Sequence, residues 1–201
     1  MTGVAKSVRE AMIEQAWLLI AERGLEGMST REVLARTGAP RGSVYHHFPR
    51  GRTELIEAAI DHSRVWMQER IEQIRPGAPD DVVAGYLGIW RRVLEGTDFR
   101  AGCAAAGAVT GSQEPAILER VQAAFEATDE ALAALFAGTG LAAEDAAARA
   151  TLLVYAAEGA VIHARARRSI EPLEFVIEQL SAGTRTRTST RTREASPGPG
   201  R

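Results

Sequence analysis

The stretch from Ser29 to Leu55 constrains the fold of this chain more than any other. Ser29 is a favourable N-terminal helix cap, and Glu32 follows at the spacing of a capping box. Gly38 permits the positive φ that ends a short helix. Pro40 is suited to the first turn of the next helix, because it lacks only an N–H that would have no partner there. The stretch therefore predicts two short helices around a tight glycine turn.

The second of these helices, predicted over residues 40–47, is rich in hydrogen-bond donors. Phe48 follows as a hydrophobic anchor, and Pro49 ends the helix behind it. A short polar helix held by another across a turn suits insertion into a DNA major groove. The same spacing is also typical of an ordinary pair of helices in a helical domain, so spacing alone leaves both readings open. The polar residues of the helix are Arg41, Ser43, Tyr45, His46 and His47.

The residues from Met12 to Leu55 also resemble the TetR family of bacterial transcriptional repressors. The matching pieces are A-x-x-L-I-A-E-R-G-L-E-G-M-S-T-R-E-V (residues 16–33) and A-R-T-G-A-P-R-G-S-V-Y-H-H-F (residues 35–48). The ending F-P-R-G-R-T-E-L and the later F-R-A-G-C (residues 99–103) are similar to the LmrA/YxaF-like branch. Pro40, where many members have a serine cap, and Arg50, where the branch has glycine, depart from the pattern and bear on the operator sequence.

The resemblance implies a repressor that binds a palindromic DNA operator as a homodimer and is released by a small-molecule effector. It implies that Tyr45 contacts backbone phosphates and that Arg52 matches a phosphate-binding lysine at the start of the fourth helix. Arg41 is the candidate for reading a base edge. The full set of candidate DNA-binding residues is Thr30, Arg41, Gly42, Ser43, Tyr45, His46 and Arg52.

The charges along the chain are distributed as a DNA-binding protein requires. Residues 1–52 carry eight basic and five acidic side chains, a net charge of +3, whereas residues 53–181 carry eleven basic and twenty acidic ones, a net charge of −9. A basic end on an acidic body suits a protein that presents one end to phosphates. Residues 182–201 are rich in Arg and Thr without an apolar period, and we expect a disordered, solvated tail.

Helical spacing of the apolar residues predicts an all-α chain of about nine helices. The predicted division is a helix-turn-helix domain over residues 1–51, a helical effector-binding and dimerisation domain over residues 52–181, and the tail. The fourth helix is predicted from Arg52 to about Arg75, long enough to connect the two domains as a lever. Small residues of the eighth helix, such as Ala157 and Gly159, allow another helix to approach closely, either in a dimer interface or within the chain.

In a TetR-like body, several large side chains would line a ligand cavity suited to an aromatic or drug-like molecule. The alternative is that most of them only fill the core. Cys103, the single cysteine, is expected to be a small buried residue rather than a redox switch. The candidate ligand-binding residues are Trp66, Met67, Tyr86, Trp90, Phe99, Cys103, Phe125 and Tyr155.

Enzyme, metal and membrane functions find no support in the sequence. It contains no G-x-S-x-G, Walker A or H-E-x-x-H motif, and no cofactor is expected. His46 and His47 are adjacent on a helix and point in different directions, so they do not form a metal site. One cysteine, a polar N-terminus and no long apolar run predict a cytoplasmic protein that contacts no membrane. The alternatives are a DNA-binding protein without an effector and, remotely, an all-helical enzyme.

Overall fold

The computed structural model describes residues 7–181, leaving residues 1–6 and the predicted tail outside. Residues 7–181 form helices, turns and loops with no strand, which confirms the all-α prediction. None of the helices in this part of the chain is long and apolar enough to cross a membrane. The helices are α1 (Val8–Gly27), α2 (Thr30–Thr37), α3 (Ser43–His47), α4 (Arg52–Ile71), α5 (Pro79–Gly96), α6 (Ala104–Val109), α7 (Pro115–Gly138), α8 (Ala143–Arg167) and a last helix over residues 171–181.

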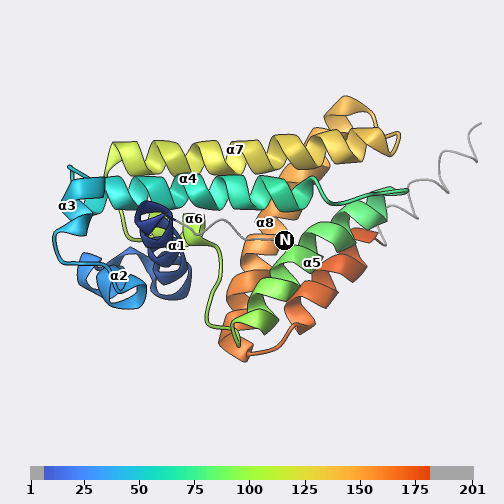
Figure 1. Cartoon of the computed structure of the whole chain (residues 1–201). Coiled ribbons are helices and arrows are strands. Elements are labelled where there is room, and N and C mark those ends of the chain that lie inside the picture. Colours follow the sequence, from blue (N-terminus) through green and yellow to red (C-terminus); the bar gives the residue numbers. More distant parts are fainter. Residues whose placement is uncertain (1–6, 182–201) are drawn as a thin grey trace, which may run out of the picture.

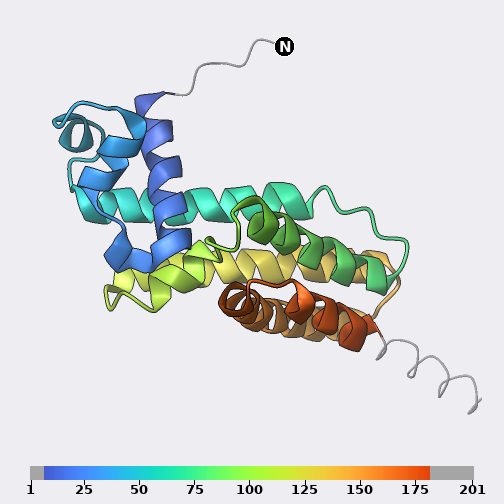
Figure 2. The same cartoon turned by 90° about the horizontal axis from the view of Figure 1, so that it is seen from below.

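Two long helices, α4 and α7, lie side by side along the long axis of the molecule (Figure 1). The head, defined here as α1–α3, packs at the N-terminal end of α4. The body, defined as α5–α8 with the last helix, extends along the rest of α4. Figure 2 shows α1 running across α4, so the head is attached along a helix and not only at one end.

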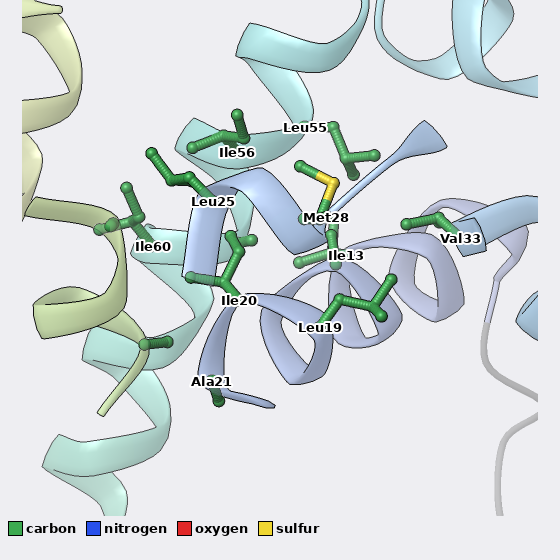
Figure 3. Close-up of a cluster of buried hydrophobic side chains, with 14 of the residues drawn as sticks. Ile13, Leu19, Ile20, Ala21, Leu25, Met28, Val33, Leu55, Ile56 and Ile60 are labelled. Carbon is green, nitrogen blue, oxygen red and sulfur yellow. The ribbon is translucent and has the colours of Figure 1, made fainter. Parts of the chain in front are cut away.

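The hydrophobic core of the head extends into α6 and α7 of the body. Figure 3 shows side chains of α1 facing side chains from the first turns of α4. The same cluster of buried residues includes Ala104 and Ala108 of α6, and Ile117 and Val121 of α7. The apolar side chains of α6 and α7 therefore add to the buried surface that stabilises the head. The division near residue 51 therefore stays a prediction, because no gap in the core marks it.

Head and body approach each other closely between α1 and α6. Gly24 has φ +69° and bends the end of α1, as expected of a residue that ends a helix. A Cβ atom on Gly107 of α6 would lie 2.9 Å from the carbonyl oxygen of Ile20. The N–H of Gly102 donates to the carbonyl oxygen of Ala21 at 2.9 Å. Glycine at position 107 therefore lets α6 touch the backbone of α1.

Two predicted helix boundaries need correction. The helix predicted from Pro40 begins instead at Ser43, whose N–H donates to the Pro40 carbonyl oxygen at 2.9 Å and closes a turn. The helix predicted to reach Arg75 ends at Ile71. Ile74 packs so closely on Gly85 that an added Cβ there would lie 2.8 Å from Cγ2 of Ile74. Ile74 therefore contacts α5 from the segment that follows the end of α4.

Capping of α2 agrees with the prediction for Ser29. Its Oγ accepts a hydrogen bond from the N–H of Glu32 at 3.1 Å. The Glu32 carboxylate pairs with Arg23 at 3.5 Å and with Arg36 at 3.7 Å. Gly38 then ends the helix with φ +68°, as predicted.

We predict that Gly107→Ala lowers the free energy of unfolding by about 1–3 kcal/mol, because the new methyl group would push α6 away from the backbone of α1. Urea denaturation monitored by circular dichroism measures the change. Gly88→Ala is the matched control, since its Cβ would meet only Arg92 Nη1 at 3.7 Å. That substitution should stabilise α5 by about 0.5–1 kcal/mol. If the Gly107→Ala protein is as stable as the control, the added methyl group does not disturb the packing of α6 on α1 and the prediction is wrong.

Candidate DNA-contacting surface and ligand cavity

The turn and α3 present one polar face outward and one apolar face inward. Val44 and Phe48 are almost completely buried against the head, and this anchors the short helix. Tyr45 is 73% exposed, and His46 and Arg41 are exposed beside it. The buried positions therefore force the donor-bearing side chains to the surface, because neighbouring residues on a helix point in different directions.

The remaining predicted DNA-binding residues lie around this face. Gly42 is exposed and precedes the first residue of α3, while Ser43 and Thr30 are half-buried at the N-terminal ends of α3 and α2. N–H groups at helix N-termini attract anions such as phosphates. The structure therefore brings these residues to one end of the molecule, and their contact with DNA stays a prediction.

Arg52 has an internal role that the sequence did not suggest. Its Nε donates to the carbonyl oxygen of Met28 at 3.1 Å, and its Nη2 donates to that of Leu25 at 2.5 Å. These hydrogen bonds attach the end of α1 to the start of α4. The side chain is still exposed at the surface, so its charge remains available to a phosphate.

Arg50, the residue that departs from the family pattern, forms a bidentate pair with the carboxylate of Glu57. The two distances are 2.9 and 2.7 Å. Arg120 of α7 reaches the same carboxylate at 3.3 Å and also pairs with Asp61 at 2.6 Å. The Arg50 guanidinium lowers the pKa of the Glu57 carboxyl, chiefly through these hydrogen bonds. This network ties the turn before α4 to α4 and α7.

His46 and His47 stack edge to face, with ring centroids 4.8 Å apart. Among residues 7–181 no group of three or more His, Cys, Asp or Glu side chains is arranged to hold a metal ion.

A cavity of about 460 Å³ lies between α4 and the body. Its walls bring together six of the eight predicted ligand-binding residues. Tyr155 is instead 70% exposed on the outer surface of α8. Phe99 is half-buried in the loop after α5, outside the cavity lining, with a left-handed φ of +57°. The expectation that these two line the cavity is therefore wrong. The six that do are Trp66, Met67, Tyr86, Trp90, Cys103 and Phe125.

The first helix also forms part of the cavity wall, which the sequence analysis missed. Trp17, Leu18 and Ala21 of α1 line it. The Trp17 ring lies 5.2 Å from that of Trp66 and 5.1 Å from that of His62, both on α4. Trp17 contacts the core of the head on one side and faces the cavity on the other.

A few polar side chains lie among the largely apolar residues of the cavity walls. Glu158 of α8 lies on the lining, and burial raises the pKa of its carboxyl to about 7. Burial also raises the pKa values of Tyr86 and Cys103, so both stay protonated near neutral pH. The helical spacing could have predicted that Glu158 faces the interior, because it shares a helical face with the buried residues Val154 and Val161.

Three arginines also line the cavity. Arg64 and Arg70 come from α4 and Arg92 comes from α5. The Arg70 guanidinium stacks on the Trp66 ring at 3.7 Å and donates to the Trp66 carbonyl oxygen at 2.9 Å. Burial lowers the pKa of Arg70, although its guanidinium remains charged.

Comparison with known proteins agrees with this arrangement. Residues 12–59 match the family described as bacterial regulatory proteins, tetR family. Residues 79–179 match the family described as transcriptional regulator LmrA/YxaF-like, C-terminal domain.

Similar sequences and structures extend over most of the chain. The HTH-type transcriptional regulator Rv0196 of Mycobacterium tuberculosis is 35% identical over 179 residues, which is 86% of this chain and 91% of that protein. YxaF of Bacillus subtilis is 24% identical over 176 residues, 86% of this chain and 92% of its own length. A TetR transcriptional regulator from Legionella pneumophila has the same fold, with a TM-score of 0.78 over 90% of this chain and 99% of that one, at 17% identity. The chain therefore belongs to the LmrA/YxaF-like branch of the TetR family, whose members are transcriptional regulators and not enzymes.

Proposed function

We propose that this regulator is a repressor that binds a palindromic operator as a homodimer and is released when a small aromatic molecule fills the cavity. The observation that carries the proposal is the shared wall between the head and the cavity, formed by Trp17 of α1. The cavity also favours this reading over a DNA-binding protein without an effector. Since the relatives are bacterial proteins, we place its action in the cytoplasm, where the DNA is.

DNA binding in this proposal uses the exposed face of α3. Arg41 reads a base edge in the major groove, and Tyr45 with Arg52 holds the backbone phosphates. Phosphate contacts act equally on all sequences, whereas a base contact acts at one position. The two kinds of contact can therefore be separated by experiment.

We predict that Arg41→Ala relaxes the preference for one base pair and costs about 1–3 kcal/mol on the operator. Arg52→Ala should weaken binding to all sequences alike and reduce the dependence of affinity on salt. Fluorescence anisotropy with DNA from the promoter beside the gene measures both, across single-base variants and salt concentrations.

Arg167→Ala is the matched control for lost positive charge, because this exposed arginine lies at the C-terminal end of α8, outside the turn and α3. It should change neither quantity. An Arg52→Ala protein with unchanged affinity and salt slope would show that the proposed docking is wrong. If the wild-type protein does not bind the promoter fragment, the proposed function itself is contradicted.

A dimer interface in this proposal uses the outer surface of α8 and the last helix. The small residues Ala157, Ala160 and Ala164 are buried within the chain, so the alternative of internal packing holds for them. Large apolar side chains are exposed instead on the opposite face of α8 and on the last helix, which an isolated chain would leave in contact with water. Their exposed fractions are 53% for Leu152, 70% for Tyr155, 61% for Ile162 and 62% for Phe175.

We predict that Ile162→Asp converts the dimer to a monomer, because it places a charge among these apolar side chains. Sedimentation equilibrium at micromolar concentration measures the change. Val109→Asp is the control, since Val109 is 41% exposed on α6, away from this surface. A monomeric wild-type protein, or a dimer that survives Ile162→Asp, would contradict the interface. Two recognition helices in such a dimer should lie about 34 Å apart, or a multiple of that distance.

Release of DNA in this proposal depends on two helices at once. A ligand wedged against Trp66 displaces α4, and a ligand against Trp17 displaces α1. Because α1 carries the core that supports α2 and α3, moving it changes how the two heads of a dimer meet the groove. A coupling free energy of about 1–3 kcal/mol changes operator affinity about 5–150-fold, and the operator must weaken the ligand by the same factor.

We predict that Trp17→Leu retains ligand binding and loses most of this coupling. The probe is the first aromatic compound in a screen that dissociates the promoter complex. Its affinity is measured by calorimetry with and without operator DNA. Trp90→Leu is the matched control, because α5 is not part of the head. It should weaken the ligand while the ratio of the two affinities stays the same. Equal ratios in wild-type and Trp17→Leu proteins would remove α1 from the mechanism.

A further inference from the structure

Two polar atoms on the cavity wall are buried without a hydrogen-bond partner. They are Oε2 of Glu158 and Nε1 of Trp90. Buried polar atoms in native proteins are almost always hydrogen-bonded, so these two atoms are available to a molecule that enters the cavity. The Tyr86 phenol lies beside the Trp90 indole N–H without completing a well-aligned hydrogen bond. The indole N–H is only a donor, and therefore requires an acceptor atom.

Burial, and not a nearby charge, is the main influence on the protonation of Glu158. The largest effect on its pKa is burial, and the Cys103 thiol only partly opposes it. Tyr86 of α5 is a neutral phenol at the same wall. On α7, the Thr128 hydroxyl donates to the Ala124 carbonyl oxygen at 3.0 Å, and the adjacent Asp129 accepts from Thr151 at 3.3 Å.

The arginines that line the cavity do not set the pKa of this carboxyl. Arg64, Arg70 and Arg92 line the same cavity, yet none of them is a cause of the shift in the pKa of Glu158. Arg70 is held against the Trp66 ring. His62 of α4 contacts the Trp17 ring at a centroid distance of 5.1 Å.

We propose that the cavity selects uncharged aromatic molecules carrying an oxygen acceptor, and that Glu158 is protonated when such a molecule is bound. The inference rests on the proposed effector role of the cavity and specifies which ligands fill it. With Glu158 protonated, the polar side chains at this wall offer donors: the Trp90 N–H, the Tyr86 O–H, the Cys103 S–H and the Glu158 O–H. A carbonyl oxygen matches this set.

Filling the cavity also strengthens the preference for the neutral carboxyl. A ligand displaces water from Glu158, and an ionised carboxylate loses more from desolvation than a neutral one. Binding of a neutral ligand therefore takes up a proton. A protonated amine would require the ionised carboxylate and would release the proton, while three arginines on the same walls repel it.

The sign of the pH dependence follows from this. In the empty cavity Glu158 is protonated below about pH 7 and ionised above it. Affinity for a neutral ligand is therefore highest below that pH and falls as the pH rises above it. With one proton taken up, the dissociation constant should increase about 30-fold between pH 6 and pH 8.5.

The fluorescent naphthyl ketone prodan is a suitable probe, titrated into the full-length protein without DNA. Wild-type protein should show the loss of affinity described above. Glu158→Gln, which keeps the shape and cannot ionise, should bind prodan with less than a twofold change over the same range. Asp129→Asn is the matched control, a carboxyl on α7 outside the lining, and should keep the wild-type pH dependence. His62 is present in all three proteins, so its titration cannot produce a difference among them.

Competition between two molecules of one skeleton tests the selectivity. 2-Acetylnaphthalene should displace prodan, and 1-(2-naphthyl)ethylamine, an ammonium at neutral pH, should not. Calorimetry at pH 7.5 in two buffers of different ionisation enthalpy should show uptake of between half and one proton. This measurement does not depend on how the variant folds.

The inference is overturned if prodan does not bind at pH 6, if its affinity is independent of pH, if Glu158→Gln titrates like the wild type, or if the amine competes better than the ketone. Failure of the proposed function would look different. A protein that does not bind the promoter, or whose promoter complex no aromatic compound dissociates, can still show this pH dependence.

Discussion

The packing of α1 against α4 and α6 is the interaction on which the rest of the structure depends. Burial of apolar side chains such as Leu19 and Ile20 holds the head together, at about 1.5–3 kcal/mol for each large side chain. The same helix touches α6 through Gly107 and lines the cavity through Trp17. In the proposed release of DNA, a displaced α1 would also move α2 and α3, because they share its core and close-packed interiors transmit strain. The candidate DNA-contacting surface and the cavity therefore share one structural element.

Charged side chains reinforce this packing where they are shielded from water. Glu57 is only 4% exposed and accepts hydrogen bonds from Arg50 and Arg120, so it connects the turn before α4 with α7. Arg165 of α8 donates to the carbonyl oxygen of Glu22 at 2.8 Å, a second link between body and head. Exposed pairs such as Arg168 with Asp98 contribute much less, because water screens them.

The cavity combines features that cost stability in the empty protein. An unpartnered indole N–H and a carboxyl forced toward neutrality are both unfavourable when buried. Such violations are expected at functional sites, where a ligand supplies the missing contacts. In the proposed effector site, the aromatic walls would supply the affinity and the few polar atoms would decide which molecules fit. Selectivity and folding stability therefore oppose each other at Glu158.

The sequence by itself determined the family, the all-α class and the position of most helices, because these depend on local patterns. Capping at Ser29 and the glycine turn at Gly38 are set by nearest neighbours along the chain. Only the tertiary structure placed Trp17 at the cavity, moved Tyr155 to the outer surface and gave Arg52 internal partners. These outcomes depend on which face of one helix meets another, far away in the sequence. A helical period predicts that a face is apolar, but packing decides what that face contacts.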